Sequence, residues 1–256
     1  MRRASALARL LPVILASGLF ACKPLAKDDA TGGRAATAQV FPRAERPVSK
    51  IVSTQFSNEA DRDLQGEAAK VMELAGIAPG MSVADVGAGE GYYTVRLAEQ
   101  VGPRGRVVAQ DIDGDALRRL GARVEHERLD NVSIKPGEAD DPRLPERSFD
   151  RILLIHMYHE VDEPYAFLWR MWPALKPGGK VVVVDMDRPT ERHGIAPSLL
   201  TCELAAVGFR LEAIHRKPEI AGYFAQFVAE ETRPEPDKIR PCRSKVAKGA
   251  PKDTGA

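Results

Sequence analysis

Hydrophobic residues follow two alternating patterns along the middle of the chain. Short apolar runs predict seven strands, at residues 82–86, 106–110, 132–135, 151–155, 180–185, 209–215 and 223–229. Stretches with helical spacing predict helices at residues 63–75, 92–100, 116–126, 164–174 and 198–206. Strands that alternate with helices are typical of an α/β domain, in which helices cover both faces of a parallel sheet.

The last two predicted strands are joined differently from the others. Only residues 216–222 separate them, and this connection contains Pro218 and Gly222. A parallel connection needs a longer crossover, usually through a helix, so these two strands must pair antiparallel as a hairpin. The pattern therefore predicts a doubly wound, seven-stranded, mostly parallel sheet whose last strand is reversed.

Residues 1–21 have the layout of a signal peptide. Three arginines come before an apolar stretch at residues 10–21, which ends at Cys22 and is short for a permanent membrane-spanning helix. The sequence Leu-Phe-Ala-Cys at residues 19–22 resembles the lipobox of bacterial lipoproteins. That resemblance implies a lipidated Cys22 that anchors the protein in the bacterial cell envelope, on the periplasmic side. The alternatives are a plain secretory signal, or a cytoplasmic enzyme whose start codon is placed too early.

The segments on either side of the α/β region differ from it in composition. Residues 22–47 are rich in Ala, Gly, Thr, Lys and Pro without an apolar period, which predicts a flexible tether. Residues 232–256 interleave Pro with Lys and Arg, which predicts a disordered tail. Residues 48–231 remain as one domain. Cys202 and Cys242 could pair in an oxidising compartment, or stay apart.

Charge changes the picture little. The net charge is +1, and the sequence has no basic patch with interleaved aromatic residues, so we expect no nucleic-acid partner.

The most informative stretch is VADVGAGEGYYT, residues 83–94. Gly87, Gly89 and Gly91 follow Asp85 at alternate positions between a strand and a helix. Glycines let the backbone turn tightly and come close to a ligand, and the start of a helix directs free amide groups at it. Dinucleotide-binding loops use the spacing G-x-G-x-x-G to hold a diphosphate. Here the spacing D-x-G-x-G-x-G places a carboxylate where it would meet a cation.

This loop resembles motif I of the class I S-adenosylmethionine-dependent methyltransferases, whose cofactor carries a sulfonium and an ammonium group and no phosphate. The resemblance implies their Rossmann-like fold, S-adenosylmethionine as cofactor, and cofactor binding by Asp85 and the three glycines. It also implies that Asp111, at the end of the next strand, binds the ribose hydroxyls while Ile112 packs on the adenine. Asp113 or Asp115 could be the ribose ligand instead, or could cap the next helix.

Two further stretches extend the resemblance to about residues 60–230. Residues 134–152, IKPGEADDPRLPERSFDRI, are similar to the segment of the family that contacts adenine; Glu138 would bind the amino group and Ala139 would offer its backbone amide. Residues 174–185, ALKPGGKVVVVD, resemble the family's turn into a buried strand. The relatives that look most similar are small-molecule enzymes such as the ubiquinone-biosynthesis methyltransferases, which implies a small-molecule methyl acceptor.

The stretch LLIHMYHEVDEP, residues 153–164, would lie at the carboxyl end of the fourth strand, where open α/β sheets bind ligands. We hypothesise that His156 or His159 is the general base, with Glu160 orienting it. Alternatively, a histidine here only packs near the methionine part of the cofactor. A metal site on these three residues is disfavoured, because loop spacing alone fixes no ligand geometry, and we expect no metal.

The segment after the fifth strand ordinarily covers the acceptor pocket in such folds. Asp185, Arg188, Arg192 and His193 are therefore possible acceptor contacts, or charged residues that face solvent. Two other functions are compatible with an α/β domain of this kind. The glycine spacing and the reversed last strand argue against a nicotinamide oxidoreductase. An exported lipoprotein that keeps the fold as a non-catalytic binding module stays open, because the cell envelope has no obvious supply of S-adenosylmethionine.

Overall fold

The computed structural model describes residues 34–50 and 59–243. The chain divides into two compact units, residues 1–34 and 35–256, and all described residues except Arg34 belong to the second. The predicted signal peptide, Cys22 and the first part of the predicted tether lie outside the described residues.

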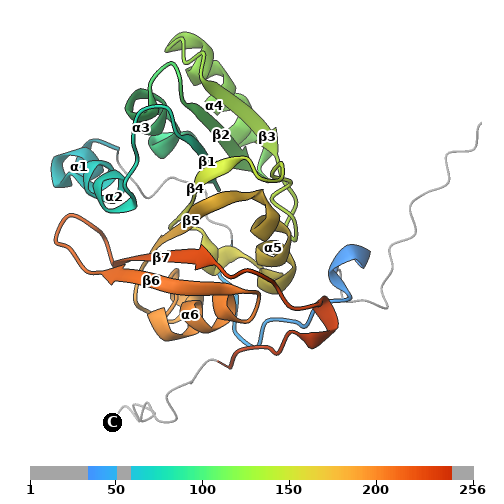
Figure 1. Ribbon diagram of the computed structural model, residues 1–256. Coiled ribbons are helices and arrows are strands. Elements are labelled where there is room, and N and C mark those ends of the chain that lie inside the picture. The colour runs from blue at the N-terminus through green and yellow to red at the C-terminus, as the bar shows by residue number, and fades with distance from the viewer. Residues whose placement is uncertain (1–33, 51–58, 244–256) are drawn as a thin grey trace, which may run out of the picture. The chain divides into compact units, whose positions relative to one another are not determined.

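A seven-stranded sheet forms the centre of this unit (Figure 1). Its strands are β1 Ser82–Val86, β2 Arg106–Asp111, β3 Val132–Pro136, β4 Phe149–Ile155, β5 Leu175–Asp185, β6 Phe209–His215 and β7 Tyr223–Ala229. The order is β3-β2-β1-β4-β5-β7-β6. The first five strands of this order, from β3 at the edge to β5, pair in parallel, whereas β7 lies antiparallel between β5 and β6. The predicted fold class, with its reversed last strand, is confirmed.

Six α-helices accompany the sheet within the described part of the chain. They are α1 Glu59–Gln65, α2 Glu67–Ala75, α3 Tyr92–Val101, α4 Gly114–His126, α5 Pro164–Met171 and α6 Pro197–Ala205. The apolar faces of α2 and α3 pack with Val83 of β1, while those of α5 and α6 pack with Ala84 and Val86. Successive strand residues point to opposite faces, so the two pairs of helices cover opposite faces of the sheet (Figure 1).

Two predicted helices end or divide where the local sequence requires it. The helix predicted at residues 63–75 is split by Gly66, which has a φ of +72°. The helix predicted at residues 164–174 ends at Met171 and continues as the 3-10 helix η5 Trp172–Ala174. Pro173 lacks the amide hydrogen that would continue α-helical bonding, which accounts for this change.

Parts of the predicted tether and tail pack on the sheet domain, in contrast to the flexible segments expected there. Phe41 and Ile239 belong to the same core cluster as α5 and α6. Arg46 is buried as well, and Cys242 forms a disulfide with Cys202 of α6. The packed body therefore extends beyond residues 48 and 231 at both ends. Among the described helices, none combines the length and the apolar character that a membrane crossing requires.

Candidate functional site

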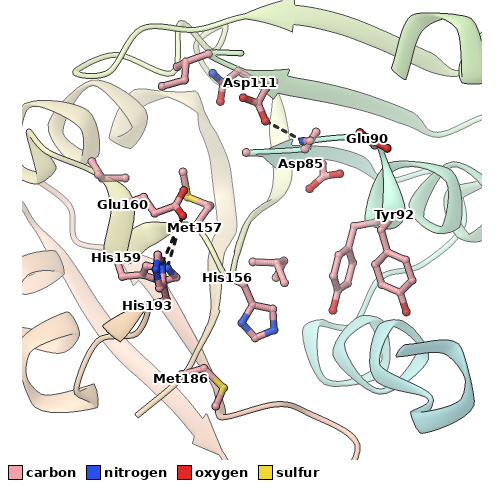
Figure 2. A pocket seen from close by; sticks show the side chains of 18 of the residues that line it. Asp85, Glu90, Tyr92, Asp111, His156, Met157, His159, Glu160, Met186 and His193 are labelled. Carbon is pink, nitrogen blue, oxygen red and sulfur yellow. Dashed lines mark hydrogen bonds and ion pairs between the residues drawn. The ribbon is translucent and has the colours of Figure 1, made fainter. Parts of the chain in front are cut away.

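A cavity of about 640 Å³ opens at the carboxyl ends of β1, β2, β4 and β5 (Figure 2). Parallel α/β sheets bind their ligands at this edge. With the exception of Gly91, every residue predicted to bind cofactor or to act in catalysis lines the cavity. These residues are Asp85, Gly87, Gly89, Asp111, Ile112, Glu138, Ala139, His156, His159 and Glu160.

The three glycines shape the loop between β1 and α3. All of them have positive φ angles, from +56° at Gly89 to +90° at Gly91. The amides of Gly87 and Ala88 donate to the carbonyl oxygen of Gln110, which ties the loop to β2. A Cβ atom on Gly91 would lie 2.4 Å from Cδ1 of Leu120 in α4. Gly91 therefore lets the loop pack closely against α4, and it does not face the cavity.

Asp85, near the carboxyl end of β1, has a buried carboxylate. Only 3 % of the residue is exposed, and the Thr94 hydroxyl donates to Oδ2 at 2.6 Å. Burial, together with the negative charge of Asp111, raises the pKa of this carboxyl to about 6. A cation placed beside it would recover much of the lost solvation, so the site favours a positively charged ligand group.

Asp111 is held by two backbone amides at the end of β2. Its Oδ2 accepts from the amide of Gly89 at 2.8 Å, and its Oδ1 accepts from that of Asp113 at 2.9 Å. Asp113 caps α4 by accepting from two amides, and Asp115 pairs with Arg118 on the surface. Neither of these two lines the cavity, whereas Asp111 does.

The predicted adenine contacts are only partly arranged for that role. Ile112 is a large apolar side chain that stays 45 % exposed at the cavity, so its surface is available to a flat ligand. Ala139 also lines the cavity. The carboxylate of Glu138, in contrast, accepts from Arg143 at 2.6 Å, and it would have to leave this exposed ion pair to bind an amino group.

His156 directly follows β4 and lines the cavity (Figure 2). Its Nε2 is 3.6 Å from Oε1 of Glu67, and its backbone has a left-handed φ of +54°. Glu67 also accepts from the Tyr93 hydroxyl and from Arg62. Burial raises the pKa of Glu67, but the bonds from His156 and Arg62 outweigh it and lower the pKa to about 2. A carboxylate that is ionised at neutral pH thus stands behind the imidazole.

His159 has a different carboxylate partner from the one predicted. Its Nδ1 lies 3.0 Å from both carboxylate oxygens of Asp185, which is fully buried at the end of β5. Glu160 was expected to orient the histidine, but its Oε1 is 3.9 Å from Nε2, on the other side of the ring. Asp185 therefore orients His159, and it does not itself line the cavity as an acceptor contact would.

The segment after β5 completes the cavity wall. Arg188 and His193 both line it, whereas Arg192 does not. The Arg188 guanidinium donates to the carbonyl oxygen of His193 at 2.8 Å, and the ring of His193 meets that of His159 edge to face. Sequence spacing could not reveal this pairing, because His159 and His193 come from separate loops at the same sheet edge.

The residues at this site fit S-adenosylmethionine. Asp85 offers a buried negative charge to an ammonium or sulfonium group, and Asp111 offers a carboxylate to a diol. The exposed face of Ile112 suits an adenine ring. The amides of Gly87 and Ala88 are already bonded to Gln110, so they do not form the open anion-binding loop that a diphosphate needs.

Comparison with known proteins agrees with this geometry. Residues 83–179 match a family model described as "Methyltransferase domain". The chain is 33 % identical over 120 residues to the ubiquinone/menaquinone biosynthesis C-methyltransferase of Shewanella oneidensis, covering 46 % of this chain and 47 % of that protein. It is 30 % identical over 122 residues to the demethylmenaquinone methyltransferase of Lactococcus lactis, covering 48 % of each. The chain thus spans about half the length of these curated relatives.

A solved structure shows the same fold. A methyltransferase from Aquifex aeolicus, described as dependent on S-adenosylmethionine, superposes with a TM-score of 0.58 at 23 % identity. The superposition covers 68 % of this chain and 98 % of that one. The sheet order, the glycine loop and the family match together show that the chain carries a class I S-adenosylmethionine-dependent methyltransferase domain, distantly related to the ubiquinone and menaquinone methyltransferases.

Proposed function

We propose that this protein transfers a methyl group from S-adenosylmethionine to a small-molecule acceptor bound in the 640 Å³ cavity. The observation that carries the proposal is the convergence of Asp85, the glycine loop and Asp111 on one end of that cavity. The curated relatives, whose names refer to ubiquinone, menaquinone or demethylmenaquinone, favour a quinone-type acceptor. The cavity has a second end, at His156 and His159, where such an acceptor would lie (Figure 2).

The cofactor would be held by residues of β1, β2 and their loops. Asp85 would bind its positively charged amino-acid end, and Asp111 would accept from the ribose hydroxyls. Ile112 and the backbone of Ala139 would contact the adenine. When bound, the cofactor supplies an electrophilic methyl group, and the protein's main task is to bring the acceptor into line with it.

We assign proton removal from the acceptor to His156. The side chain is about a quarter exposed, at 27 %, and it faces the cavity, so an acceptor can reach it. The ionised Glu67 behind Nε2 stabilises the imidazolium that forms when the ring takes up a proton. His159 is less suited to this role, because only 3 % of it is exposed.

Calorimetric titration of the full chain with S-adenosylmethionine tests the proposal. We expect binding in the micromolar range that weakens at least about tenfold in Asp85→Ala and stays unchanged in Asp115→Ala, a surface control. NADH should not bind. Absence of S-adenosylmethionine binding to the folded protein would overturn the proposal. Binding without turnover on any quinone or hydroquinone would favour the non-catalytic binding module.

We further propose that the protein works in the bacterial cell envelope, anchored through Cys22. The Cys202–Cys242 disulfide supports this location, because such bonds persist in oxidising compartments. The test is mass spectrometry of the N-terminal peptide, from wild type and from Cys22→Ser, after expression in a Gram-negative host. A diacylglyceryl-modified Cys22 in the membrane fraction is expected. An unprocessed N-terminus in the cytosol, with Cys202 and Cys242 reduced, would contradict the proposal.

A further inference from the structure

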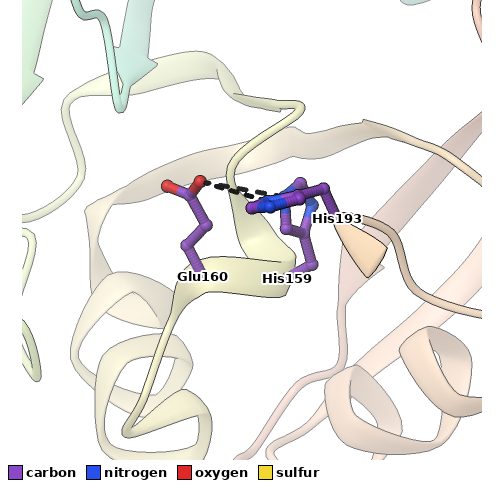
Figure 3. Close-up of side chains that lie close together, drawn as sticks. All are labelled: His159, Glu160 and His193. Carbon is purple, nitrogen blue, oxygen red and sulfur yellow. Dashed lines mark ion pairs between the residues drawn. The ribbon is translucent and has the colours of Figure 1, made fainter. Parts of the chain in front are cut away.

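Three potential metal ligands meet at the acceptor end of the cavity (Figure 3). They are His159 and Glu160 from the 3-10 helix η4 Tyr158–Glu160, and His193 from the loop after β5. One ligand atom from each lies within 4.8 Å of the other two. Oε1 of Glu160 is 3.9 Å from Nε2 of His159 and also 3.9 Å from Nδ1 of His193.

Asp185 gives the first histidine the arrangement of a metal ligand. Its carboxylate lies 3.0 Å from Nδ1 of His159, which favours the tautomer that carries the proton on Nδ1. In that tautomer the lone pair of Nε2, 3.9 Å from Oε1 of Glu160, is available to a metal ion. A carboxylate behind a histidine in this way is the usual support of metal-bound imidazoles. Asp185 is itself fixed by the amide of Met186, which donates to Oδ1 at 2.7 Å.

The backbone around the three ligands is held by bonds from distant parts of the chain. The guanidinium of Arg46 donates to the carbonyl oxygens of His159 and Val161, on either side of Glu160. Arg188 donates to the carbonyl oxygen of His193, whose left-handed φ of +55° turns the loop back to the cavity. These bonds place the side chains before any ligand arrives.

We propose that His159, Glu160 and His193 bind a divalent transition-metal ion of the zinc class, and that its open positions take an oxygen of the methyl acceptor. Two imidazoles with one carboxylate favour zinc or a neighbouring transition metal over magnesium or calcium. Three protein ligands leave at least one position free, as in catalytic rather than structural zinc sites. All three residues line the cavity, so a free position would face the acceptor.

The distances suit an ion after a small closure. Zinc–nitrogen and zinc–oxygen bonds of about 2.0–2.2 Å place neighbouring ligand atoms roughly 3.3–3.6 Å apart in a tetrahedral site. The two separations of 3.9 Å from Glu160 must therefore shrink by about half an ångström, and the two histidine nitrogens, which lie within 4.8 Å of each other, must come within the same range. The proposal requires this closure to come from Glu160 and His193, since Asp185 holds His159 in place.

The inference rests on the proposed function for the identity of the acceptor but not for the metal itself. It also changes the expectation of no metal: the loop pair His156 and His159 does not form the site, whereas His193 from another loop replaces His156. Each of the two histidines has a carboxylate partner, Glu67 for His156 and Asp185 for His159. The metal would give them different roles, because His156 would take up the proton and His159 would bind the ion.

Zinc titration of the tag-free full chain tests the proposal. The background variant is Cys22→Ser, which leaves no cysteine outside the disulfide. After treatment with a chelator, we expect one zinc ion per chain by calorimetry and elemental analysis. His193→Asn and Glu160→Gln should each weaken binding at least about tenfold. The control variants are His126→Asn, at the exposed end of α4, and Glu191→Gln, exposed beside the site; both should bind zinc as the background does.

Two further readouts separate this proposal from the others. Asp185→Asn, if it keeps the wild-type circular dichroism, should also weaken zinc binding, whereas a merely structural role of Asp185 would leave the affinity unchanged. S-adenosylmethionine affinity should stay the same in His193→Asn, so failure of the metal site and failure of the cofactor site are distinguishable. Absence of stoichiometric zinc on the folded background chain, or equal zinc affinity in His193→Asn, would overturn the proposal.

Discussion

Arg46 and Glu203 lie 157 residues apart in sequence and form an ion pair that is sealed from solvent. Nε of Arg46 is 2.8 Å from Oε1 of Glu203, and both side chains have 0 % exposure. The Tyr158 hydroxyl donates to the other carboxylate oxygen at 2.7 Å. The pair therefore joins the N-terminal part of the packed body, helix α6 and the 3-10 helix that carries His159 in one buried network.

Removal of one partner of this pair should be costly. Arg46→Met leaves the Glu203 carboxylate buried without its cation, and we expect the free energy of unfolding to fall by about 3–5 kcal/mol. The double variant Arg46→Met with Glu203→Leu removes the isolated charge and should recover most of that loss. Urea denaturation of both variants measures the difference. A double variant no more stable than the single one would show that the charges are not coupled.

The affinity for S-adenosylmethionine should depend on pH through Asp85. Its carboxyl has a pKa of about 6 in the free protein, and only the ionised form attracts the cationic cofactor. Affinity should therefore be constant above about pH 7 and fall toward tenfold per pH unit below pH 6. Calorimetry between pH 5 and pH 8 measures this, with Asp85→Asn as the control. A wild-type affinity as flat with pH as that of the control would contradict the assignment.

The same residue should destabilise the free protein. A raised carboxyl pKa means that the folded protein binds a proton at Asp85 more tightly than the unfolded chain does. The stability that this proton contributes is fully present below the unfolded pKa near 4, and it is lost as the pH rises through 6. At pH 7, the free energy of unfolding of Asp85→Asn should thus exceed that of the wild type by on the order of 1–3 kcal/mol, and the variant should unfold at a higher temperature. Thermal unfolding at pH 7 and pH 4 checks the sign, since the difference should shrink at the lower pH.

His156 should be needed for turnover and not for cofactor binding. The suitable replacement is asparagine, because it tolerates the left-handed backbone at this position better than alanine. We expect His156→Asn to lower kcat by about 10²–10⁴-fold, with the S-adenosylmethionine Kd unchanged. The release of S-adenosylhomocysteine measures turnover, with an acceptor that the wild type methylates. His126→Asn is the surface control, and equal rates in both variants would remove His156 from the mechanism.

Gly91 should tolerate no side chain, although it lies outside the cavity. A Cβ atom there meets Leu120 at 2.4 Å, on a backbone with φ of +90°. Gly91→Ala should therefore lower the free energy of unfolding by about 1–3 kcal/mol. Gly114→Ala is the matched control, because nothing lies within 4 Å of its added Cβ atom and it begins α4. Urea midpoints compare the two, and an equal effect would show that the loop relaxes freely.

Reduction of the disulfide should loosen the C-terminal segment. Cys202 and Cys242 are 40 residues apart, and a closed loop of this length stabilises a fold by about 3–4 kcal/mol in the chain-entropy model. Dithiothreitol should thus lower the melting temperature of the wild type and have no effect on Cys202→Ala with Cys242→Ala. Identical melting curves with and without reductant would contradict this expectation.

Local signals account for the parts of the structure that the sequence predicted. Apolar runs located the seven strands, and the short connection before Tyr223 predicted the reversed β7. Asp85 and Asp111 lie at the carboxyl ends of two strands that pair in parallel, so their positions at one sheet edge could be expected from the order of elements. A carboxylate at the end of a strand needs no knowledge of distant packing to be placed.

The partners of the two histidines required the folded structure. Glu67 reaches His156 from a helix that precedes the sheet, and Asp185 reaches His159 from the next strand. Both contacts depend on how α2 and β5 pack, which no local spacing encodes. The packing of the two ends of the domain could not be predicted for a related reason. The few apolar residues that pack there, Phe41 and Ile239 among them, lie in segments whose composition is otherwise typical of linkers.

The left-handed backbones at His156 and His193 are strained, so each histidine lowers the thermal stability of the protein while it supplies a side chain to the cavity. At both positions glycine would adopt the observed φ, +54° or +55°, with less strain than histidine, by roughly 1 kcal/mol each. Selection for heat resistance alone would therefore favour glycine at both sites. The selected proteins would keep the sheet and the glycine loop while they lost both imidazoles. Directed evolution of this chain toward thermostability thus has to score activity in every round, because relief of backbone strain at these two positions would remove residues that line the cavity.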